Sequence, residues 1–573
     1  MIHLQRSLAR VLLVLVLVLT ANVLWTHHIT AWNPGMRNPV LGYDAAQYAL
    51  AARHLAETGE LATTYALPIE LAHHASPPWP LAVLQPGLVL AQAWVFSVTP
   101  KIVRLPGAEP MLFNDPTRRE QLVLVIPFIC FLAIGAAIGM AVARLILRVR
   151  PESSIWLTSL AGFAAALPFL LDPEAQHFAS GGFNELPFTL GLTGALAAIA
   201  LGRAARFPLL FGLLLGLTGL FRGNMLWIAP WLAGGASIAA APGRRRRVFV
   251  IAMIGWAVPM APWWWYKWQA FGSPAWDLSV LSVWDGIGGR SWFTLNHLPE
   301  RPEVPGGFAA VLPVAQKIVA NVPRVLLAVL TGPRALWVGA LVLWLVVTRR
   351  RDAVWAAGFA ILGAAVANLL IAAATIPWLR YMFPVRALLE VAGLLAMWAL
   401  AGRLGTAASG RSIVRLTRAG VAAIAIAYGL LQTERGVQEA ATSSAERGTP
   451  RSRTMNEIAE LVQNEVPVGE PVMSNLGPIL AWRAQRPVIH LAQTPDDVAA
   501  CRERVEFRHV ILAFRDPERA WRGWDQILER PAEAPQNPDW NVTFVRQYRS
   551  QDGFDVVWLE LGPMKPGLAL HAK

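Results

Sequence analysis

Asp44 is an acidic residue just beyond the first long apolar stretch of the chain, in the sequence GYDAAQY at positions 42–48. A carboxylate in this place can deprotonate an acceptor hydroxyl or amine, and general-base catalysis of this kind contributes about 10²–10⁴-fold to a rate. Residues 45–58 contain few helix breakers and are followed by Gly59, which predicts a helix that opens on Asp44. The spacing of Asp44 and Gln47 also fits a capping box, so a role as a helix cap alone stays open.

Glu185 is a second acidic residue, at the start of an apolar segment in the sequence GGFNEL at positions 181–186. An acid in the first turn of a helix is stabilised by the helix dipole and needs no further role. A carboxylate at the outer end of a membrane-spanning helix also suits a metal ion or an acceptor group. Both interpretations stay open.

Arg222, in FRGN, and Arg380, in WLRYMFP, are basic residues on a side of the chain where few cations occur. The planar guanidinium group binds a phosphate or diphosphate in bidentate geometry. Extension of the side chain toward lipid headgroups is the alternative interpretation. The two arginines are therefore candidate phosphate ligands.

His73 and His74 lie shortly before the sequence PPWP at positions 77–80. Adjacent histidines do not share one helix face, so this pair alone does not suit a two-histidine metal site. Packing or surface exposure is the simpler interpretation, and contact of one ring with a carboxylate or a phosphate is the other. We assign no cofactor, and a divalent metal stays open.

The elements that must position these side chains are membrane helices. Of 573 residues, 55% are hydrophobic and only 15% are charged, 25 are tryptophan, and the mean hydropathy is +0.42. This composition excludes an ordinary soluble protein. A bilayer core needs roughly 20 apolar residues per helix, and many segments approach that length. We predict about eleven spans, at about 8–27, 121–143, 154–171, 186–202, 208–221, 225–241, 248–266, 333–348, 353–375, 384–401 and 419–431.

The arginine-rich loops predict the orientation of these spans. Basic residues gather in every second connection, beginning with Arg6 and Arg10, and positive residues favour the cytoplasmic side. This placement accounts for the formal charge of +13 and argues against a nucleic-acid partner. The N-terminus is then cytoplasmic. The outer side holds three segments, at about 28–120, 267–332 and 432–573.

The apolar stretch 79–98 lies within the first outer loop and is interrupted by Pro80 and Pro86. If it were a span, every later loop would change sides, so we predict a helix at or partly within the membrane interface. The first outer loop is thus predicted to carry juxtamembrane helices, and one of them opens on Asp44.

The tail has the residue pattern of a small α/β domain. We predict short buried strands at 472–474 and 510–514 and helices at 456–464 and 517–528. We also predict a terminal hairpin formed by 542–548 and 554–561. Asp516 is placed to cap the second helix, with Pro517 in its first position. The predicted fold class is a polytopic α-helical membrane protein, with a membrane domain at 1–431 and an outer α/β domain at 432–573.

The order of these features resembles the GT-C glycosyltransferases, particularly the superfamily of protein O-mannosyltransferases and lipid A aminoarabinose transferases. The matching segments are YDAAQYALA at 43–51, SPP at 76–78, RLP at 104–106, RYMFP at 380–384, and the region 472–491 with RPV at 486–488. The resemblance covers most of the chain. Two departures concern Ala45, where many members have a second acid, and residues 75–76, where many have an acid followed by lysine.

The resemblance implies a sugar donor linked to polyprenyl phosphate and an acceptor that attacks the anomeric carbon with inversion, with Asp44 as general base. The lipid phosphate would be stabilised by arginine or a metal. The implied phosphate ligands are Arg53, Arg222, Arg380 and Tyr381, and the implied sugar or acceptor groove includes Tyr48, His73, His74 and Asn184. Glu185 is the second catalytic candidate. The donor sugar and the acceptor, whether glycan, lipid or protein, stay open.

Two other classes of function fit the composition. A polytopic lipid or sugar transporter or flippase predicts ionisable residues in the middle of the spans, whereas here the polar residues gather at the outer ends. A non-catalytic envelope assembly protein would leave Asp44 as a helix cap. The abundance of alanine and arginine favours a bacterial source, so the predicted location is the inner membrane, with the tail in the periplasm and membrane lipid as a partner.

Overall fold

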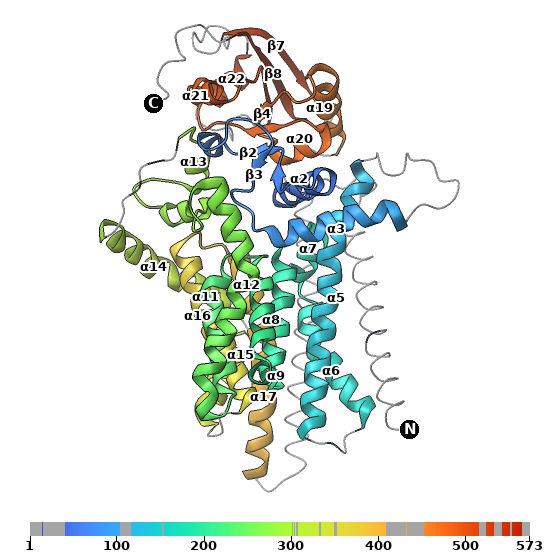
Figure 1. Ribbon diagram of the computed structural model, residues 1–573, viewed down its shortest axis with the longest axis vertical. Coiled ribbons are helices and arrows are strands. Elements are labelled where there is room, and N and C mark those ends of the chain that lie inside the picture. Colours follow the sequence, from blue (N-terminus) through green and yellow to red (C-terminus); the bar gives the residue numbers. More distant parts are fainter. Residues whose placement is uncertain are drawn as a thin grey trace. The chain divides into compact units, whose positions relative to one another are not determined.

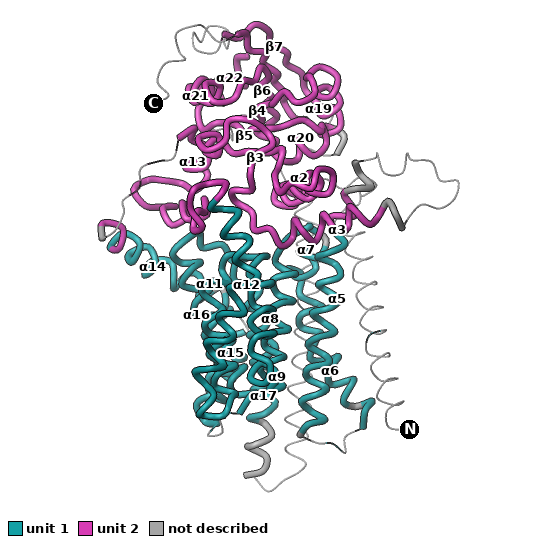
Figure 2. Tube along the Cα trace, in the orientation of Figure 1, with its two compact units in different colours: residues 1–34, 124–268, 312–445 teal, residues 35–123, 269–311, 446–573 magenta. Residues whose placement is uncertain are grey.

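The structure is a computed structural model that describes residues 41–102, 116–149, 154–300, 308–331, 334–348, 352–407, 452–514, 523–531, 541–550 and 553–563, with a few isolated residues between them. By contacts the chain divides into two compact units (Figure 2). The helical unit combines residues 1–34, 124–268 and 312–445, and the α/β unit combines 35–123, 269–311 and 446–573. The first outer loop is thus grouped with the C-terminal residues. The predicted boundary between membrane domain and outer domain at residue 431 stays a proposal.

The helical unit is built from long apolar helices (Figure 1). Among the described residues, five segments are long and apolar enough to cross a membrane, at Leu122–Arg148, Pro242–Phe271, Ala309–Leu327, Ala353–Ala374 and Leu379–Leu400. Its main helices are α5 (Pro116–Val149), α6 (Ile155–Leu170), α7 (Pro173–Gly181), α8 (Glu185–Ala200), α10 (Pro208–Gly219), α11 (Met225–Ile238), α12 (Arg245–Phe271), α14 (Phe308–Val329), α15 (Arg334–Val347), α16 (Ala353–Ala374) and α17 (Phe383–Ala407). The chain is therefore a helical membrane protein. The predicted spans 8–27 and 419–431 lie outside the continuously described residues, so the count of eleven stays a prediction.

Helix α14 differs from the prediction, because the sequence analysis placed residues 267–332 in an outer loop. The helix contains Pro313 and Pro323, and the charged residues Lys317 and Arg324 make its apolar run less continuous. Few of its side chains are buried. Prolines and charges in an amphipathic helix weaken the signal of a continuous apolar run, which is why the sequence pattern missed it.

Glycines allow helices α10 and α12 to pack with their backbones in contact. A Cβ atom added at Gly212 would lie 2.2 Å from the carbonyl oxygen of Ala252, and one added at Gly255 would lie 2.7 Å from the carbonyl oxygen of Leu209. Membrane helices associate largely through such close contacts between small residues. The crossing of α10 and α12 therefore requires these glycines.

We expect Gly212→Ala to destabilise the protein by about 1–3 kcal/mol, because the added methyl group has no space at the helix crossing. Gly234→Ala in α11 is the matched control, since a Cβ atom there meets nothing within 4 Å. Thermal unfolding of the purified protein in detergent, followed by tryptophan fluorescence, measures the difference. Equal melting temperatures for the two variants would contradict the described crossing.

The α/β unit contains a six-stranded sheet with strand order β2-β5-β4-β6-β8-β7. The strands are β2 (Tyr65–Ala66), β4 (Val472–Ser474), β5 (Val488–His490), β6 (His509–Phe514), β7 (Val542–Arg549) and β8 (Asp555–Leu561). The first four pair in parallel, and β8 is antiparallel to both β6 and β7. The predicted strands at 472–474 and 510–514 and the terminal hairpin are confirmed. Strands β5 and β2 were not predicted.

Alternate residues of the central strands enter two different apolar cores, so both faces of the sheet are covered. Val472 and Ile511 belong to one core, and their neighbours Met473 and Val510 belong to the other. The surrounding helices include α19 (Ser452–Glu465), α20 (Gly477–Ala484), α21 (Asp497–Arg504) and α22 (Trp524–Glu529). The predicted helix at 456–464 is confirmed, and residues 516 and 517 of the other predicted helix lie outside the described residues.

Two helices of the first outer loop also belong to the α/β unit. Helix α2 (Tyr43–Thr58) ends at Gly59, which has a left-handed backbone with φ of 80° and closes the helix as predicted. Helix α3 (Pro86–Ile102) starts at Pro86, whereas Trp79–Pro80 forms strand β3, paired with β1 (Ala62–Thr63). The stretch 79–98 is therefore part strand and part helix.

Candidate functional site

Asp44 lies in the first turn of α2, with its side chain half-buried. The N-cap residue of the helix is Gly42, which has an extended backbone, and no side chain forms a capping hydrogen bond there. The capping-box interpretation of Asp44 and Gln47 is therefore wrong, because Asp44 lies inside the helix rather than before it. The carboxylate still benefits from the partial positive charge of the helix N-terminus.

An aromatic–histidine cluster, composed of Tyr43, Tyr65, His297 and His490, lies beside this helix start within the α/β unit. The hydroxyl groups of Tyr43 and Tyr65 are hydrogen-bonded to each other, and the ring of His490 lies 5.5 Å from that of Tyr43 and 6.0 Å from that of Tyr65. The rings of His297 and His490 are 4.6 Å apart. The sequence analysis missed this cluster, because its members come from four separate stretches of chain.

Burial keeps this cluster uncharged. It lowers the pKa of His297 to about 4 and the pKa of His490 well below its usual value, and it raises the pKa of both tyrosines. Each histidine makes a hydrogen bond through Nδ1, His490 with the carbonyl oxygen of Ser474 at 3.1 Å and His297 with that of Phe293. A neutral ring that donates from Nδ1 keeps no proton on Nε2.

Glu70 lies in the same unit and is also held in its neutral form. Its side chain is 8% exposed, and burial raises its pKa to about 8. The backbone N–H of Leu67 donates to Oε2 at 2.6 Å and favours the ionised form, but the loss of hydration is the larger effect. The contributions of Glu70 and of the two histidines to folding stability thus change with pH in opposite directions.

We predict that Glu70→Gln changes the pH–stability profile between pH 4.5 and pH 8, the range over which the contribution of Glu70 to folding varies. The pKa of Glu70 is raised from 4.5 to about 8, so its contribution to folding is fully present below pH 4.5 and is lost as pH rises toward 8. The pKa of His297 is lowered from 6.5 to about 4, so its contribution is present above pH 6.5 and is lost as pH falls toward 4. Each contribution amounts to a few kcal/mol, at about 1.4 kcal/mol per pH unit.

Melting temperatures between pH 4 and pH 9 measure these effects. Glutamine keeps an oxygen that accepts from Leu67, so the variant should lose the decline between pH 6.5 and pH 8. Between pH 6.5 and pH 4.5 it should decline more steeply than the wild type, because the gain from Glu70 no longer offsets the loss from His297. Superimposable profiles for wild type and variant would show that Glu70 is ionised in the folded protein.

Other predicted site residues of the α/β unit make packing contacts. Tyr48 is buried in α2. Arg53 donates from Nη1 to the backbone oxygen of Trp482 at 3.1 Å, and its guanidinium carbon lies 4.8 Å from the centre of the Trp482 ring. These contacts hold α2 against α20.

His73 and His74 contact the last turn of α12 and the residues that follow it. The ring of His73 is edge-on to Trp276 at 5.3 Å, and Nε2 of His74 is hydrogen-bonded to the carbonyl oxygen of Ala270 at 2.8 Å. Across the described residues, the structure contains no group of three or more histidine, cysteine or acidic side chains suited to a metal ion. These contacts agree with the packing interpretation of the two histidines.

The helical unit brings together four predicted residues, Glu185, Arg222, Arg380 and Tyr381, which we call the acid–arginine cluster. Oε1 of Glu185 lies 3.1 Å from Nη1 of Arg222 and 3.8 Å from Nε of Arg380. The Glu185 side chain is 1% exposed, whereas that of Arg380 is 34% exposed. The first residue of α8, the turn after α10 and the segment before α17 therefore converge on one carboxylate.

The ring of Tyr381 lies against both arginines of this cluster. Its centre is 5.1 Å from the guanidinium carbon of Arg222 and 5.6 Å from that of Arg380. Cation–π contacts of this kind hold a guanidinium group in place without neutralising its charge. Asn184, another predicted residue, donates from Nδ2 to the backbone oxygen of Phe221 at 2.9 Å and so fixes the residue before Arg222.

Two asparagines that the sequence analysis did not single out connect the same segments. Nδ2 of Asn224 donates to Oδ1 of Asn368 at 2.8 Å, and Nδ2 of Asn368 donates to the backbone oxygen of Tyr381 at 2.8 Å. Asn368 is 2% exposed in the middle of the apolar helix α16. A lone buried amide in an apolar membrane helix is an informative signal, and it would have identified this residue.

The acid–arginine cluster carries a formal charge of +1, because two guanidinium groups face one carboxylate. A buried carboxylate that contacts arginine is better suited to positioning the cations than to accepting a proton. The excess charge and the partly exposed Arg380 suit an anion with several oxygen atoms, such as a phosphate.

A second buried ion network lies in the helical unit. Arg386 in α17 contacts Asp172 at 3.0 Å and Glu174 at 2.7 Å, and Glu390 contacts Arg334 at 2.7 Å. Asp172 is also the N-cap of α7, where it accepts a hydrogen bond from the backbone N–H of Glu174. Arg386 and Glu390 of α17 are thus paired with neighbouring segments, as expected for a structural network.

No family model matches the sequence, and no curated protein matches it. Two solved structures of ArnT from Cupriavidus metallidurans are similar to this chain. The structure bound to undecaprenyl phosphate is 14% identical, with a TM-score of 0.52, and the match covers 97% of this chain and 98% of that chain. The apo structure is also 14% identical, with a TM-score of 0.53 and coverage of 95% and 97%. Over nearly its whole length, this membrane protein therefore has the fold of ArnT, as its resemblance to the lipid A aminoarabinose transferases implied.

Proposed function

We propose that the protein is a membrane glycosyltransferase that moves a sugar from a polyprenyl-phosphate-linked donor to an acceptor at the periplasmic face of the bacterial inner membrane. The observation that supports this most is the acid–arginine cluster, a partly exposed site with excess positive charge in a bundle of membrane helices. The fold of the whole chain is also that of ArnT, which was crystallised with undecaprenyl phosphate. A lipid phosphate is an anion that reaches such a site from the bilayer.

In this proposal Arg222 and Arg380 bind the donor phosphate, and Tyr381 and Glu185 hold the two guanidinium groups in position. Negative charge grows on the phosphate as the bond to the sugar breaks, and fixed cations lower the energy of that transition state. Arg53 already contacts Trp482 through its guanidinium group, so we assign it a supporting role at most.

Asp44 acts as the general base. It accepts the proton of the acceptor hydroxyl or amine, the acceptor oxygen or nitrogen forms a bond to the anomeric carbon, and the bond from that carbon to the phosphate oxygen breaks. Polyprenyl phosphate leaves with the bonding electrons, and a single displacement inverts the anomeric configuration. Glu185 was the other candidate base, but its contacts with two arginines favour a positioning role.

The remaining assignments follow from the sequence and complete the proposal. We assign Tyr48, His73, His74 and Asn184 to contacts with the sugar or the acceptor, and a divalent metal at the phosphate stays open. The N-terminus is cytoplasmic, residues 1–431 form the membrane domain, and the tail from residue 432 is periplasmic.

The test is turnover by the purified protein in lipid nanodiscs with a panel of polyprenyl-phosphate sugars, measured as release of polyprenyl phosphate. We expect at least one donor to react and the product to have the inverted anomeric configuration. A product with retained anomeric configuration would exclude the single-displacement mechanism. If no donor reacts, while a fluorescent lipid-linked sugar crosses the bilayer of proteoliposomes, the flippase hypothesis would replace this one.

A further inference from the structure

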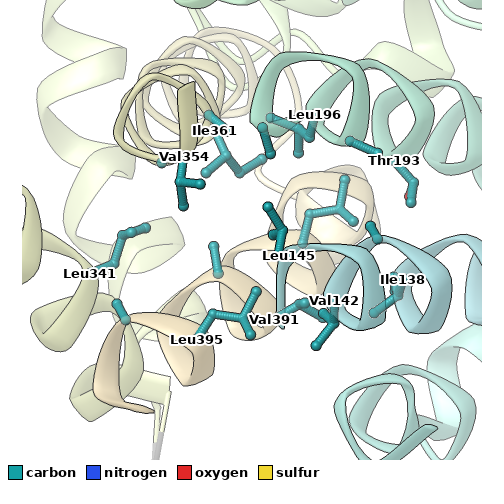
Figure 3. A pocket seen from close by; sticks show the side chains of 18 of the residues that line it. Ile138, Val142, Leu145, Thr193, Leu196, Leu341, Val354, Ile361, Val391 and Leu395 are labelled. Carbon is teal, nitrogen blue, oxygen red and sulfur yellow. The ribbon is translucent and has the colours of Figure 1, made fainter. Parts of the chain in front are cut away.

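A cavity of about 170 Å³ lies within the helical unit, between helices α5, α8, α15, α16 and α17 (Figure 3). Its walls are apolar and mostly aliphatic, with Trp344 from α15 and Thr193 from α8 as the exceptions. Residues such as Val142, Leu196, Ile361 and Leu395 point toward its interior (Figure 3). An apolar cavity of roughly 150 Å³ stays dry and admits an apolar guest the size of benzene. The cavity therefore suits a hydrocarbon rather than water or a polar solute.

The cavity is separate from the acid–arginine cluster. Glu185 is the first residue of α8, whereas the cavity is lined by residues 193–200 of that helix. At 1.5 Å per residue, this places the lining about 12–22 Å along the helix from Glu185. The lining residues of α17, Leu388 to Ala399, likewise begin well beyond Arg380.

Two exposed arginines lie at the far end of the cavity. Arg148 is in α5, three residues beyond the lining residue Leu145, and Arg203 is three residues beyond the lining residue Ala200. Leu145 and Arg148 are therefore about one helical turn apart on the same face of α5. Arg203 starts the short helix α9, after Gly202, whose left-handed backbone with φ of 70° follows the end of α8. Within the described part of the chain, neither arginine has an acidic partner.

An apolar cavity in a membrane bundle, with arginines at one end, suits both the hydrocarbon chain and the charged headgroup of an anionic lipid. The hydrocarbon chain fills a space that no side chain fills, and the phosphate headgroup meets the guanidinium groups. We propose that this cavity binds the acyl chain of an anionic phospholipid, with its headgroup at Arg148 and Arg203. The site is independent of the proposed donor site and of the proposed glycosyl transfer.

The test is photolabelling of the full-length protein in nanodiscs that contain phosphatidylglycerol with a diazirine near the end of one acyl chain. Peptides of α5, α8 and α17 that line the cavity should be labelled, as mapped by mass spectrometry. The same probe with a phosphatidylcholine headgroup should label them less, by about fivefold for each arginine that contacts the anionic headgroup. Arg148→Gln with Arg203→Gln should abolish that difference.

Ala392→Phe fills the cavity and should remove the labelling, and Ala197→Phe serves if the first variant does not fold. Ala335→Phe is the matched control, since Ala335 is exposed on α15 and does not line the cavity. Gel filtration and melting temperature establish that each variant is folded. Equal labelling by both headgroups, labelling that persists in the filled variant, or labelling by polyprenyl phosphate alone would overturn the proposal.

Discussion

Asp44→Asn is expected to lower sugar transfer by about 10²–10⁴-fold while leaving donor binding and folding intact, because asparagine keeps the shape of the side chain and cannot accept the proton. The structure makes this substitution a clean test. Asp44 is not the N-cap of α2, so its replacement does not remove a capping hydrogen bond. Turnover of polyprenyl-phosphate sugars by the purified protein gives the rate, and a melting curve gives the stability.

Glu60→Gln is a suitable control, because Glu60 lies just beyond the same helix and its exposed side chain makes a weak contact with His54, at 3.9 Å. It should retain the wild-type rate. Full activity of Asp44→Asn would place the general base elsewhere. Loss of donor binding along with turnover would instead assign Asp44 to the donor site, and the binding measurement separates these two results.

The helices of the fold could be predicted largely from sequence, because most apolar runs become helices with ends within a few residues of those predicted. Helix α14 was missed, since prolines and charges interrupt its apolar pattern. Strand β2 was missed for another reason. It is only two residues long, at Tyr65–Ala66, and its parallel partner β5 lies more than 400 residues later in the chain. Such pairing depends on tertiary contacts that no local pattern records.

The candidate site was predicted residue by residue but not as an arrangement. Arg222 and Arg380 were selected because basic residues are rare on the predicted outer side, and Glu185 because it opens an apolar segment there. Glu185 Oε1 lies 3.1 Å from Arg222 Nη1 and 3.8 Å from Arg380 Nε because of the way α8, α10 and α17 pack. The hydropathy pattern does not encode this packing. Asn368 was overlooked although a buried amide in an apolar helix was visible in the sequence.

Arg222→Gln is expected to weaken the binding of undecaprenyl phosphate by about 10–100-fold, because a hydrogen bond to a charged group contributes about 1.5–3 kcal/mol. Inhibition of turnover, or direct binding to the protein in detergent, measures the affinity. Arg206→Gln is the matched control, since Arg206 is exposed in α9 (Arg203–Arg206) and lies outside the acid–arginine cluster. An unchanged affinity for Arg222→Gln would remove this arginine from the phosphate site.

A double-mutant cycle distinguishes phosphate binding from simple neutralisation of Glu185. Arg222→Gln leaves the buried carboxylate with only the 3.8 Å contact to Arg380, so the single variant loses stability as well as affinity. Glu185→Gln removes the carboxylate and raises the positive charge of the site, so it should lower stability without weakening phosphate binding. The two changes together relieve the unpaired charge. If Arg222 binds the phosphate, the double variant recovers melting temperature but not affinity. If Arg222 only balances Glu185, both quantities recover together, and the phosphate ligand must be sought among other cations.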